Sequence, residues 1–456
     1  MIIASQLNFI LSPDETKKMI PLNKIKKIAG KALRFPKSFL RFLGDFIIVK
    51  SRAHKQKEII RSIKNRPKIK VAFQLIHASI WKCDVLYELL REDPQFDPLV
   101  VISPHFPSSE YEREKEYQRC IDLCKDKNYQ YVITRQDGVY LSLEVIFNGE
   151  RPDVVFIQNA WERTLPQYQI SAYPQSLVCY IPYFFTLNIL FKKNYSKLFH
   201  SLLWAYFVES DWHRDQSIKY SRFNKINAVA LGYPGLDRFL FPKGLRVDSW
   251  PDSTVHGTAE KKRVIYAPHH TISTSDAGLA YSTFEKFGLA IQVKARELKE
   301  QFSFVFKPHP LLFDKLCDHP EWGKERAQAY WDDWGSISGT PVVEGDYTDL
   351  FHDSDCLIHD CNSFLAEYLA TGKPCLFLMN DENIPDRINE YGGYLLAAHY
   401  KAFSENDIWT FLESVFVNKH DPMLEERRSA RDNYLIPPHG KSASKNIAEF
   451  LTESLR

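Results

Sequence analysis

The sequence has 456 residues and a mass of 53.2 kDa, more than the roughly 250 to 300 residues at which a single hydrophobic core stops growing. Hydrophobic residues at 44% and charged residues at 25% are ordinary for a folded protein, so neither extended disorder nor a collagen-like repeat is expected. The eight cysteines show no CxxC pair and no zinc-knuckle spacing. We therefore expect two domains, reduced thiols, and no metal or other cofactor.

The net charge of +2 hides an uneven distribution. Residues 17–70 hold 18 Lys and Arg but only two acids, so this segment carries +16 and the rest of the chain carries −14. Apolar residues such as Ile28, Leu33 and Phe42 lie between the cations at near-helical spacing. A basic, apolar helix binds anionic membranes, with about 1 kcal/mol for each Lys or Arg. We expect a basic amphipathic helical arm at residues 1–66; the alternative is a solvated helix that packs on its own domain.

Other partners and locations are less favoured. The longest apolar run, residues 181–191, contains Pro182 and Asn188 and is shorter than the roughly 18 to 20 residues of a membrane-spanning helix. The first residues lack a basic region followed by a small-residue cleavage site, so no secretory signal is expected. The acidic body does not favour nucleic acid as a partner. The sequence predicts a cytoplasmic protein, peripheral at the inner face of the cell membrane.

From Ile69 onward, short apolar runs alternate with helical stretches, as in parallel βαβ units. The first series of predicted strands comprises 70–76, 97–104, 129–134, 153–159, 176–183 and 204–210. Helices are predicted between them at 79–92 and 109–127. Near-continuous apolar strands indicate burial on both faces, so residues 67–240 are predicted to form a Rossmann-like, doubly wound domain that binds the acceptor.

The polar residues 241–262, rich in Pro, Gly and Ser, predict a linker before a second series. The second series of predicted strands comprises 263–268, 302–310, 341–345, 355–360 and 374–379. The helices predicted with them are 283–301, 323–334 and 362–372. Residues 263–456 are thus predicted to form a second Rossmann-like domain, for a nucleotide donor. Because GxGxxG and GxxxxGK[ST] are both absent, a group-transfer enzyme fits better than a dehydrogenase or an NTPase.

Polar residues gather where the strands of the second series end, which is where open α/β sheets bind ligands. They are His269, His270, Lys307, His309, Asp360, Asn362 and Ser363. Lys307 and His309 suit electrostatic support of a diphosphate. In an extended segment only one of the adjacent pair His269 and His270 is expected to face the cleft, and we favour His269.

A helix is predicted to start at Asn362 or Ser363, either of which is a good N-cap. Its free amides would then bind a phosphate. Glu367, one turn further, can accept hydrogen bonds from a ribose diol; the alternative is an acid that stabilises the first turn of the helix.

The first series offers a base for an acceptor hydroxyl. His77 directly follows the first strand, and His105 follows the second. Imidazole has a suitable pKa for this task, and His77 is the better placed; the alternative is a histidine that caps a helix or positions substrate. Trp161, Tyr180 and Tyr183 are candidates for an acceptor platform, with core packing as the alternative.

The segments YAPHH, FKPHP and DLFHDSDCLIHDCNSFLAEYLATGKPCLFL resemble the CDP-glycerol glycerophosphotransferase family, GT-B enzymes that build teichoic-acid-like and capsular polymers. The family's (R/K)xHP pattern falls on Lys307, His309 and Pro310. Its Asp-x-Ser-Ser signature, later acid and Lys-Pro fall on Asp360, Asn362, Ser363, Glu367, Lys373 and Pro374. The arginine of the family's YAPT(W)R segment is lost, and its HGT motif has no counterpart in the first series, so the acceptor half is divergent.

The resemblance implies a GT-B-like α/β fold, with two Rossmann-like domains that face a central cleft. It implies transfer of glycerol phosphate, or a related polyol phosphate, from a CDP-activated donor to a lipid-linked or saccharide acceptor, with release of CMP. His77 would be the base, and Lys307, His309 and the amides at Asn362 and Ser363 would neutralise the phosphates. Glu367 would hold the ribose, His269 and His270 are further candidates for donor binding, and no metal is required. Two alternatives are a GT-B glycosyltransferase of capsule or lipopolysaccharide synthesis and a non-catalytic scaffold.

Overall fold

The computed structural model describes most of the chain from Lys37 onward. The described residues are 37–64, 66–106, 109–223, 226–242, 248–251, 261–272, 280–338, 342–343, 345–380 and 384–456. The chain divides into two compact units, residues 1–54 and 55–456. Residues 1–36 of the predicted arm lie outside the described residues.

Helix α3 (Lys37–Ile63) is the described part of the predicted basic arm. Large apolar side chains that are 39–50% exposed follow one another near its start: Phe39, Phe42, Leu43, Phe46, Ile47 and Ile48. Steps of three and four residues place most of them on one face of the helix. Among the described helices, none is long and apolar enough to cross a membrane.

The first sheet contains seven parallel strands in the order β3-β2-β1-β6-β7-β8-β9. They are β1 (Ile69–Leu75), β2 (Phe96–Ile102), β3 (Tyr131–Ile133), β6 (Val154–Ile157), β7 (Leu177–Tyr180), β8 (Ala205–Val208) and β9 (Ala228–Ala230). All six predicted strands are present, and β9 was not predicted. The strand order reverses between β1 and β6, so the ligand-binding crevice of this sheet lies at their carboxyl ends.

Short helices and one hairpin complete this first half of the molecule. Its α-helices are α4 (Asp84–Glu92), α5 (Glu110–Asp126), α6 (Leu143–Ile146), α7 (Phe191–Tyr195), α8 (Leu198–Leu202), α9 (Asp211–Tyr220) and α10 (Asp237–Leu240). Its 3-10 helices are η2 (Ala78–Ile80), η3 (Pro166–Tyr168), η4 (Ile170–Ala172) and η5 (Pro234–Leu236). The antiparallel hairpin is β4 (Arg135–Gln136) and β5 (Val139–Tyr140). Helix α5 starts with a reciprocal capping box between Ser109 and Glu112, which explains why it begins where the sequence predicts.

The second sheet contains five parallel strands in the order β11-β10-β12-β13-β14. They are β10 (Lys262–Ala267), β11 (Phe302–Phe306), β12 (Cys356–His359), β13 (Cys375–Leu378) and β14 (Tyr400–Ala402). Of the predicted strand 341–345, residues 341 and 344 lie outside the described residues, and the described ones are in no strand. The Val343 amide donates one backbone hydrogen bond of 3.1 Å to Phe306 at the end of β11. Strand β14, which was not predicted, is the last strand at the other edge.

The second half carries most of the longer helices. They are α11 (Phe284–Glu297), α12 (Leu312–Cys317), α13 (Gly323–Ser338), α14 (Thr348–Asp353), α15 (Phe364–Glu367), α16 (Glu390–Ala397), α17 (Glu405–Leu412), α18 (Leu424–Ala430) and α19 (Ala443–Leu455). Shorter turns are η7 (Leu369–Thr371), η8 (Ile384–Arg387), η9 (Glu413–Val417), η10 (Arg431–Leu435) and η11 (Pro438–Gly440). The strand order of this sheet reverses between β10 and β12, which places its crevice at their carboxyl ends.

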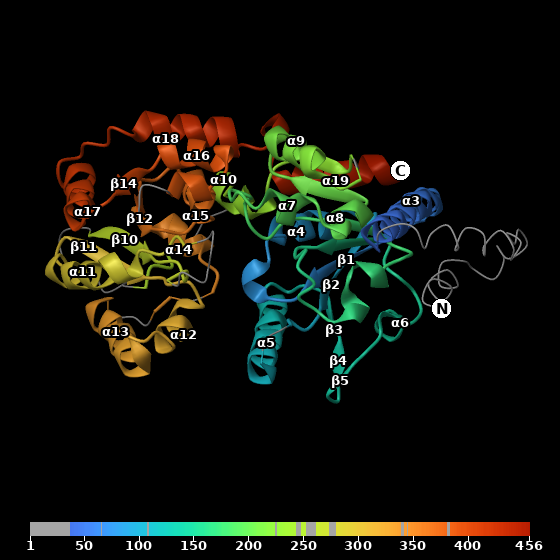
Figure 1. Ribbon diagram of the computed structural model, residues 1–456, viewed down its shortest axis with the longest axis horizontal. Coiled ribbons are helices and arrows are strands. Elements are labelled where there is room, and N and C mark those ends of the chain that lie inside the picture. The colour runs from blue at the N-terminus through green and yellow to red at the C-terminus, as the bar shows by residue number, and fades with distance from the viewer. Residues whose placement is uncertain are drawn as a thin grey trace, which may run out of the picture. The chain divides into compact units, whose positions relative to one another are not determined.

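The C-terminal helix α19 packs with the first sheet, although it follows the second in sequence (Figure 1). Leu451 and Leu455 belong to the hydrophobic cluster that covers β1 and β2. The carboxylate of Asp237 accepts hydrogen bonds of 2.8 Å from the amides of Ala443 and Ser444 and so holds the start of the helix. The predicted second domain therefore contains a helix that serves the core of the first.

The described part of the predicted linker 241–262 is packed against the second sheet. Trp250 is 4% exposed, and its Nε1–H donates a hydrogen bond of 2.9 Å to Ser303 Oγ. Residues 243–247 and 252–260 lie outside the described residues. The predicted linker is polar in composition, but its Trp250 is a buried aromatic residue.

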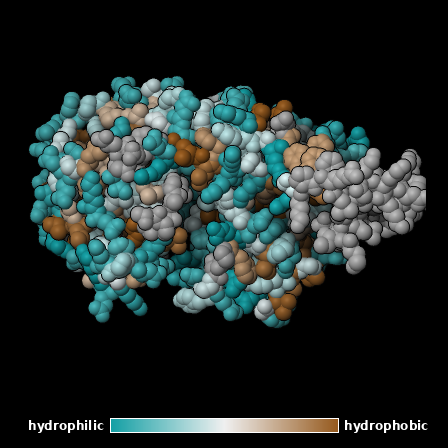
Figure 2. Space-filling view, viewed as in Figure 1, coloured by the Kyte–Doolittle hydropathy of each residue, from teal (hydrophilic) through white to brown (hydrophobic). Residues whose placement is uncertain are grey.

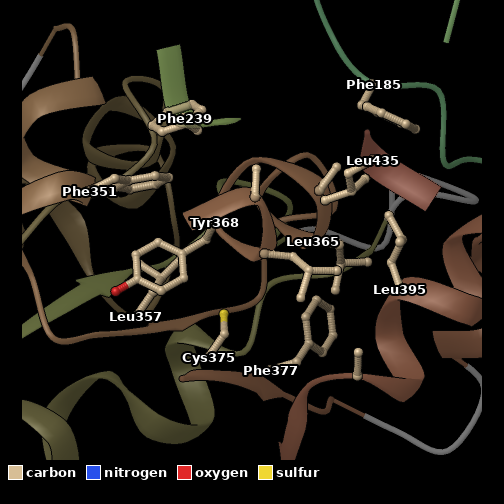
Figure 3. Packing of buried hydrophobic residues seen from close by; sticks show 14 of the residues in the cluster. Phe185, Phe239, Phe351, Leu357, Leu365, Tyr368, Cys375, Phe377, Leu395 and Leu435 are labelled. Atoms are coloured by element: carbon tan, nitrogen blue, oxygen red, sulfur yellow. The ribbon is translucent and has the colours of Figure 1, made fainter. Parts of the chain in front are cut away.

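One hydrophobic cluster joins the two halves of the molecule. Phe185 and Phe239 of the first half lie above Leu365 and Phe377 of the second (Figure 3). Outside, hydrophilic residues dominate the visible surface, and hydrophobic residues gather in small separate patches (Figure 2). The shared core holds the carboxyl ends of the two sheets toward one cleft.

Candidate functional site

Three histidines meet at the carboxyl ends of β10 and β11. The ring centroids of His269 and His270 are 4.4 Å apart, and that of His309 lies 5.1 Å from the first and 4.1 Å from the second. The two strands are neighbours, and the His309 amide donates a hydrogen bond of 3.0 Å to the carbonyl of Pro268. The expectation that only one of the adjacent histidines reaches the site is wrong, because β10 ends at Ala267 and its alternation ends with it.

Burial favours the neutral imidazole at His269 and His309. It lowers the pKa of His309 to about 2, with further lowering by His270 and Lys307. It also lowers the pKa of His269 well below its usual range. One nitrogen from each of the three rings lies within 4.8 Å of the others. Such a group can donate N–H bonds to phosphate oxygens or, alternatively, bind a metal ion.

Asp360 holds the loop that carries His269. Its carboxylate is fully buried and accepts hydrogen bonds of 2.5 Å from the amides of His269 and Thr283, and of 2.8 Å from Thr283 Oγ1. Burial raises the pKa of Asp360 to about 6, against the opposing effect of these bonds. The prediction that Asp360 contacts the donor is therefore corrected: this carboxylate positions the loop from beneath.

The predicted capped helix after Asn362 is much shorter than expected. Helix α15 spans only Phe364–Glu367, and Ser363 has helical angles (φ −64°, ψ −32°) with no side-chain cap bond. An N-cap needs an extended backbone, so Ser363 does not cap this helix as predicted. The phosphate site predicted at the amides of Asn362 and Ser363 stays a prediction. Ser363 Oγ instead lies 3.2 Å from Cys361 Sγ, and Asn362 Nδ2 lies 3.5 Å from Tyr281 OH.

Glu367 joins a charged network between the two halves. Its side chain is 1% exposed, its Oε2 accepts a hydrogen bond from Tyr347 OH, and its Oε1 lies 3.6 Å from Lys82 Nζ. Lys82, from the first half, also donates a hydrogen bond of 2.9 Å to Tyr347 OH. Lys307 Nζ lies 4.9 Å from the centre of the Tyr347 ring. Lys82 and Tyr347 were not predicted: Lys82 lies between η2 and α4, and Tyr347 directly precedes α14, so neither directly follows a strand.

Burial also changes Lys307 itself. It lowers the pKa of Lys307 to about 8, and the nearby ammonium of Lys82 lowers it further. Lys307 is 6% exposed and forms no ion pair with any carboxylate of the described residues. A cavity of about 120 Å³ adjoins the network, lined by Lys82, Tyr347 and Arg238 among others. Lys307 itself does not line this cavity. A buried ammonium that forms no ion pair among the described residues is nevertheless suited to an anionic ligand.

His77 lies just after β1 at the carboxyl end of the first sheet, before η2, and its side chain is 30% exposed. Its Nδ1 lies 3.1 Å from Glu116 Oε1 and 2.9 Å from Ser79 Oγ. Burial first, and then Arg119, lower the pKa of His77 to about 4. Glu116 was not predicted, because it lies on the highly charged helix α5, where one acid among several carries no distinguishing signal.

Two further groups flank His77. The His105 ring lies 5.5 Å from the His77 ring, in an edge-to-face arrangement. Of the three aromatic residues predicted as a platform, Tyr180 is 3% exposed and packs in the core, as the alternative proposed. Trp161 and Tyr183 are partly exposed, and Lys197 Nζ lies 3.9 Å from the Trp161 ring.

The sequence profile of one family, described as CDP-Glycerol:Poly(glycerophosphate) glycerophosphotransferase, matches residues 193–443, more than half of the chain. The chain belongs to this family. It is a transferase of the CDP-glycerol glycerophosphotransferase type, and the predicted function is confirmed at this level. No curated protein sequence matches the chain.

Solved structures with the same fold include teichoic acid enzymes. A histidine-to-asparagine variant of the wall teichoic acid polymerase TagF has 14% identity and a TM-score of 0.53, with 96% of this chain and 98% of that chain covered. UDP-GlcNAc 2-epimerase from Neisseria meningitidis, bound to UDP-GlcNAc, has 15% identity and a TM-score of 0.53, with 85% and 100% covered. These similarities confirm the predicted GT-B-like fold.

The family match is uneven across the cleft. Residues 193–443 include Lys307, His309 and Glu367 at the end of the second sheet. His77 and Glu116 lie outside the matched range. The glycerophosphotransferase motifs thus lie at the second sheet, and the site at the first sheet depends on geometry alone.

Proposed function

We propose that this enzyme transfers glycerol phosphate, or a related polyol phosphate, from a CDP-activated donor to a hydroxyl of a lipid-linked or saccharide acceptor. The product would be a bacterial cell-surface polymer, and CMP would leave. The observation that carries the proposal is the buried ammonium of Lys307 near the cluster of three histidines, together with a histidine held by a carboxylate at the end of the first sheet.

In the proposed donor site, Lys307 supplies positive charge and the cluster of His269, His270 and His309 supplies N–H donors to the diphosphate. Phosphoryl transfer needs mainly correct positioning and charge stabilisation, and both arise from side chains fixed at strand ends. A bound diphosphate would also raise the low pKa of His309, because a nearby negative charge favours imidazolium. No step of this reaction requires a metal ion.

His77 is the proposed base. His77 Nδ1 accepts a hydrogen bond of 3.3 Å from the Ser79 amide. To act as base, the ring would take the tautomer with the proton on Nδ1, which would give up that bond and donate to Glu116 Oε1, 3.1 Å away, so that Nε2 can accept a proton. The acceptor O–H gives its proton to Nε2, and its oxygen bonds to the phosphorus that carries glycerol. The bond from this phosphorus to the bridging oxygen then breaks, and the bridging oxygen leaves on CMP.

Glu367 is the proposed ribose ligand. Its two oxygens face Tyr347 and Lys82, so ribose hydroxyls would compete with these partners for the carboxylate. The exchange would open the contact between the two halves at this point. Asn362 is placed to contact the donor, because its Oδ1 is buried with no hydrogen-bond partner among the described residues.

The exposed apolar face of α3, with its many cations, supports an anionic membrane surface as a further partner. Lipid-linked acceptors lie at such a surface. We propose a peripheral position at the inner face of the cell membrane, where the enzyme would meet its acceptor.

Donor binding tests this proposal. Full-length enzyme is titrated by calorimetry with CDP-glycerol, CDP-ribitol, CDP and CMP, and with UDP, UDP-sugars, GDP-sugars and CMP-sugars. Selective binding of cytidine diphosphate compounds, weakened in His309→Ala, is expected. Selective binding of a nucleotide sugar would instead indicate a GT-B glycosyltransferase, and no nucleotide binding would indicate a scaffold.

A further inference from the structure

A second cluster of metal-ligating side chains lies below the donor site, in the interior of the second half. His359 ends β12, Cys375 begins β13, and His399 lies between α16 and β14. The parallel register pairs Leu357 with Cys375 and His359 with Phe377, so His359 and Cys375 point to the same face of the sheet. Figure 3 shows the Cys375 side chain pointing from its strand into the hydrophobic cluster on that face.

These three residues are buried and close together. Their exposed fractions are 0% for His359 and Cys375 and 1% for His399. One ligand atom from each lies within 4.8 Å of the others, and the two ring centroids are 5.8 Å apart. No solvent reaches this cluster, so every polar atom in it needs a partner from within.

The hydrogen bonds of the two rings leave one nitrogen of each without a partner. His399 Nδ1 lies 2.8 Å from the carbonyl of Leu395, which only accepts, so Nδ1 carries the proton. His359 Nδ1 lies 3.0 Å from the carbonyl and 3.2 Å from the amide of Cys361. Neither Nε2 has a hydrogen-bond partner among the described residues. The single S–H of Cys375 can serve only one of them at a time.

We propose that His359, Cys375 and His399 form a buried structural site for a transition-metal ion of the zinc or copper class. On binding, the Cys375 thiol releases its proton to solvent, and His359 takes the tautomer whose Nδ1–H donates to the Cys361 carbonyl rather than accepting from the Cys361 amide. The thiolate and the two Nε2 lone pairs then bond to the ion. All three groups are then satisfied. Metal-ligating histidines commonly hold the other ring nitrogen on a backbone carbonyl, as His399 does here.

The ligand set narrows the class of ion. Thiolate with imidazole suits Zn²⁺ and copper and does not suit Mg²⁺ or Ca²⁺, which take oxygen ligands. His359 is followed directly by Asp360, which holds the loop of His269. The ion would therefore fix the end of β12 beneath the donor site without touching the reacting groups. The sequence predicted no metal, because the three ligands come from separate elements.

Metal analysis of full-length protein, purified without a tag or chelator, tests the proposal. We expect about one zinc or copper ion per chain. Protein stripped by a chelator should melt at a lower temperature and recover on addition of the ion. Titration of the stripped protein with Co²⁺ should produce thiolate-to-cobalt absorption. Wild-type protein with background metal and no cobalt absorption would overturn the proposal.

Four variants locate the ion. Cys375→Ala and His399→Gln should each lose it, while Cys356→Ala, a matched change of a buried cysteine on the opposite face of the sheet, should keep it. His309→Ala should also keep it. Loss in His309→Ala with retention in Cys375→Ala would place the ion in the histidine cluster of the donor site and refute this assignment. If Cys375→Ala does not fold, the cobalt titration of the wild type decides.

Discussion

The carboxyl ends of the two sheets both present histidines to the cleft, but they hold them by different means. At the second sheet, the backbone of His269 is held by the buried carboxylate of Asp360, and His309 is held by the neighbouring strand. At the first sheet, His77 is held through its ring, by Glu116 and Ser79. The histidines of the second sheet are thus fixed through their backbone, by a neighbouring strand and a buried acid. His77 of the first sheet is fixed through its side chain, by Glu116 of α5 and by Ser79.

This difference shows what each end can tolerate. A loop tied by its backbone keeps its shape when a side chain changes, whereas a ring tied by one carboxylate turns when that carboxylate is lost. The family match covers the second sheet and β8 and β9 of the first, and leaves His77 and Glu116 outside it. Changes at the two ends should therefore fail in different ways.

Asp360→Ala should have the largest effect, because Asp360 holds the loop that carries His269 in the proposed donor site. It would leave the amides of His269 and Thr283 and the Thr283 hydroxyl buried without an acceptor, at a cost of about 3 kcal/mol or more in unfolding free energy. Urea unfolding measures this loss. Asp360→Asn keeps the shape and should lose less; equal stability of Asp360→Ala and wild type would contradict the assigned role.

Asp360 also gives a signed pH dependence. Its pKa rises from 3.8 in the unfolded chain to about 6 in the fold, so the native state binds the proton more tightly. Its contribution to stability is full below about pH 4 and is lost as pH rises through about 6. The unfolding free energy of Asp360→Asn, plotted against pH, should lack this decrease between about pH 4 and 6. The same pH dependence in Asp360→Asn and wild type would contradict the prediction.

His77→Ala should lower kcat by about 10² to 10⁴-fold and leave CDP-glycerol affinity unchanged, because a base acts on the acceptor. In the wild type, kcat/KM should fall as pH drops through about 4, since burial disfavours imidazolium and the neutral ring is the active form. Rate profiles from pH 3 to 8 measure this. An acid limb near 6.5, or an equal loss in the control His105→Ala, would contradict the assignment.

His309→Ala should lower kcat/KM by about 10² to 10³-fold, with weaker binding of CDP-glycerol, because one donor to the developing charge is lost. Glu367→Ala should weaken donor binding in the same way. Calorimetry and initial rates distinguish this pattern from that of His77→Ala. The exposed His420 offers a matched control, and wild-type rates in His309→Ala would refute the proposed donor site.

Removal of residues 1–54 should have the smallest effect on chemistry. The cut spares Ile59 and Ile63, which lie in the core beneath the first sheet. We expect weaker, more salt-sensitive partition onto anionic liposomes and unchanged turnover of a water-soluble acceptor. Liposome sedimentation of full-length and truncated enzyme measures the partition, and equal sedimentation would refute the membrane role.

Much of the fold and part of the site could be predicted from the sequence. Alternating apolar runs and helices predicted both sheets, because a strand that is buried on both faces is apolar along its own length. Because parallel strands end at one edge, the polar residues that follow them, His269, His309 and Asp360, were expected together. The prediction failed at Ser363, where the backbone turned out to be already helical.

The contacts that give these residues their roles depend on elements far apart in the chain. No local pattern pairs Glu116 with His77, brings Lys82 to Glu367, or sends α19 back to the first sheet. The sequence by itself determined which segments become strands and which polar side chains follow them. The tertiary structure alone decided which of these side chains meet, because burial and pairing act between residues that only the folded chain brings together.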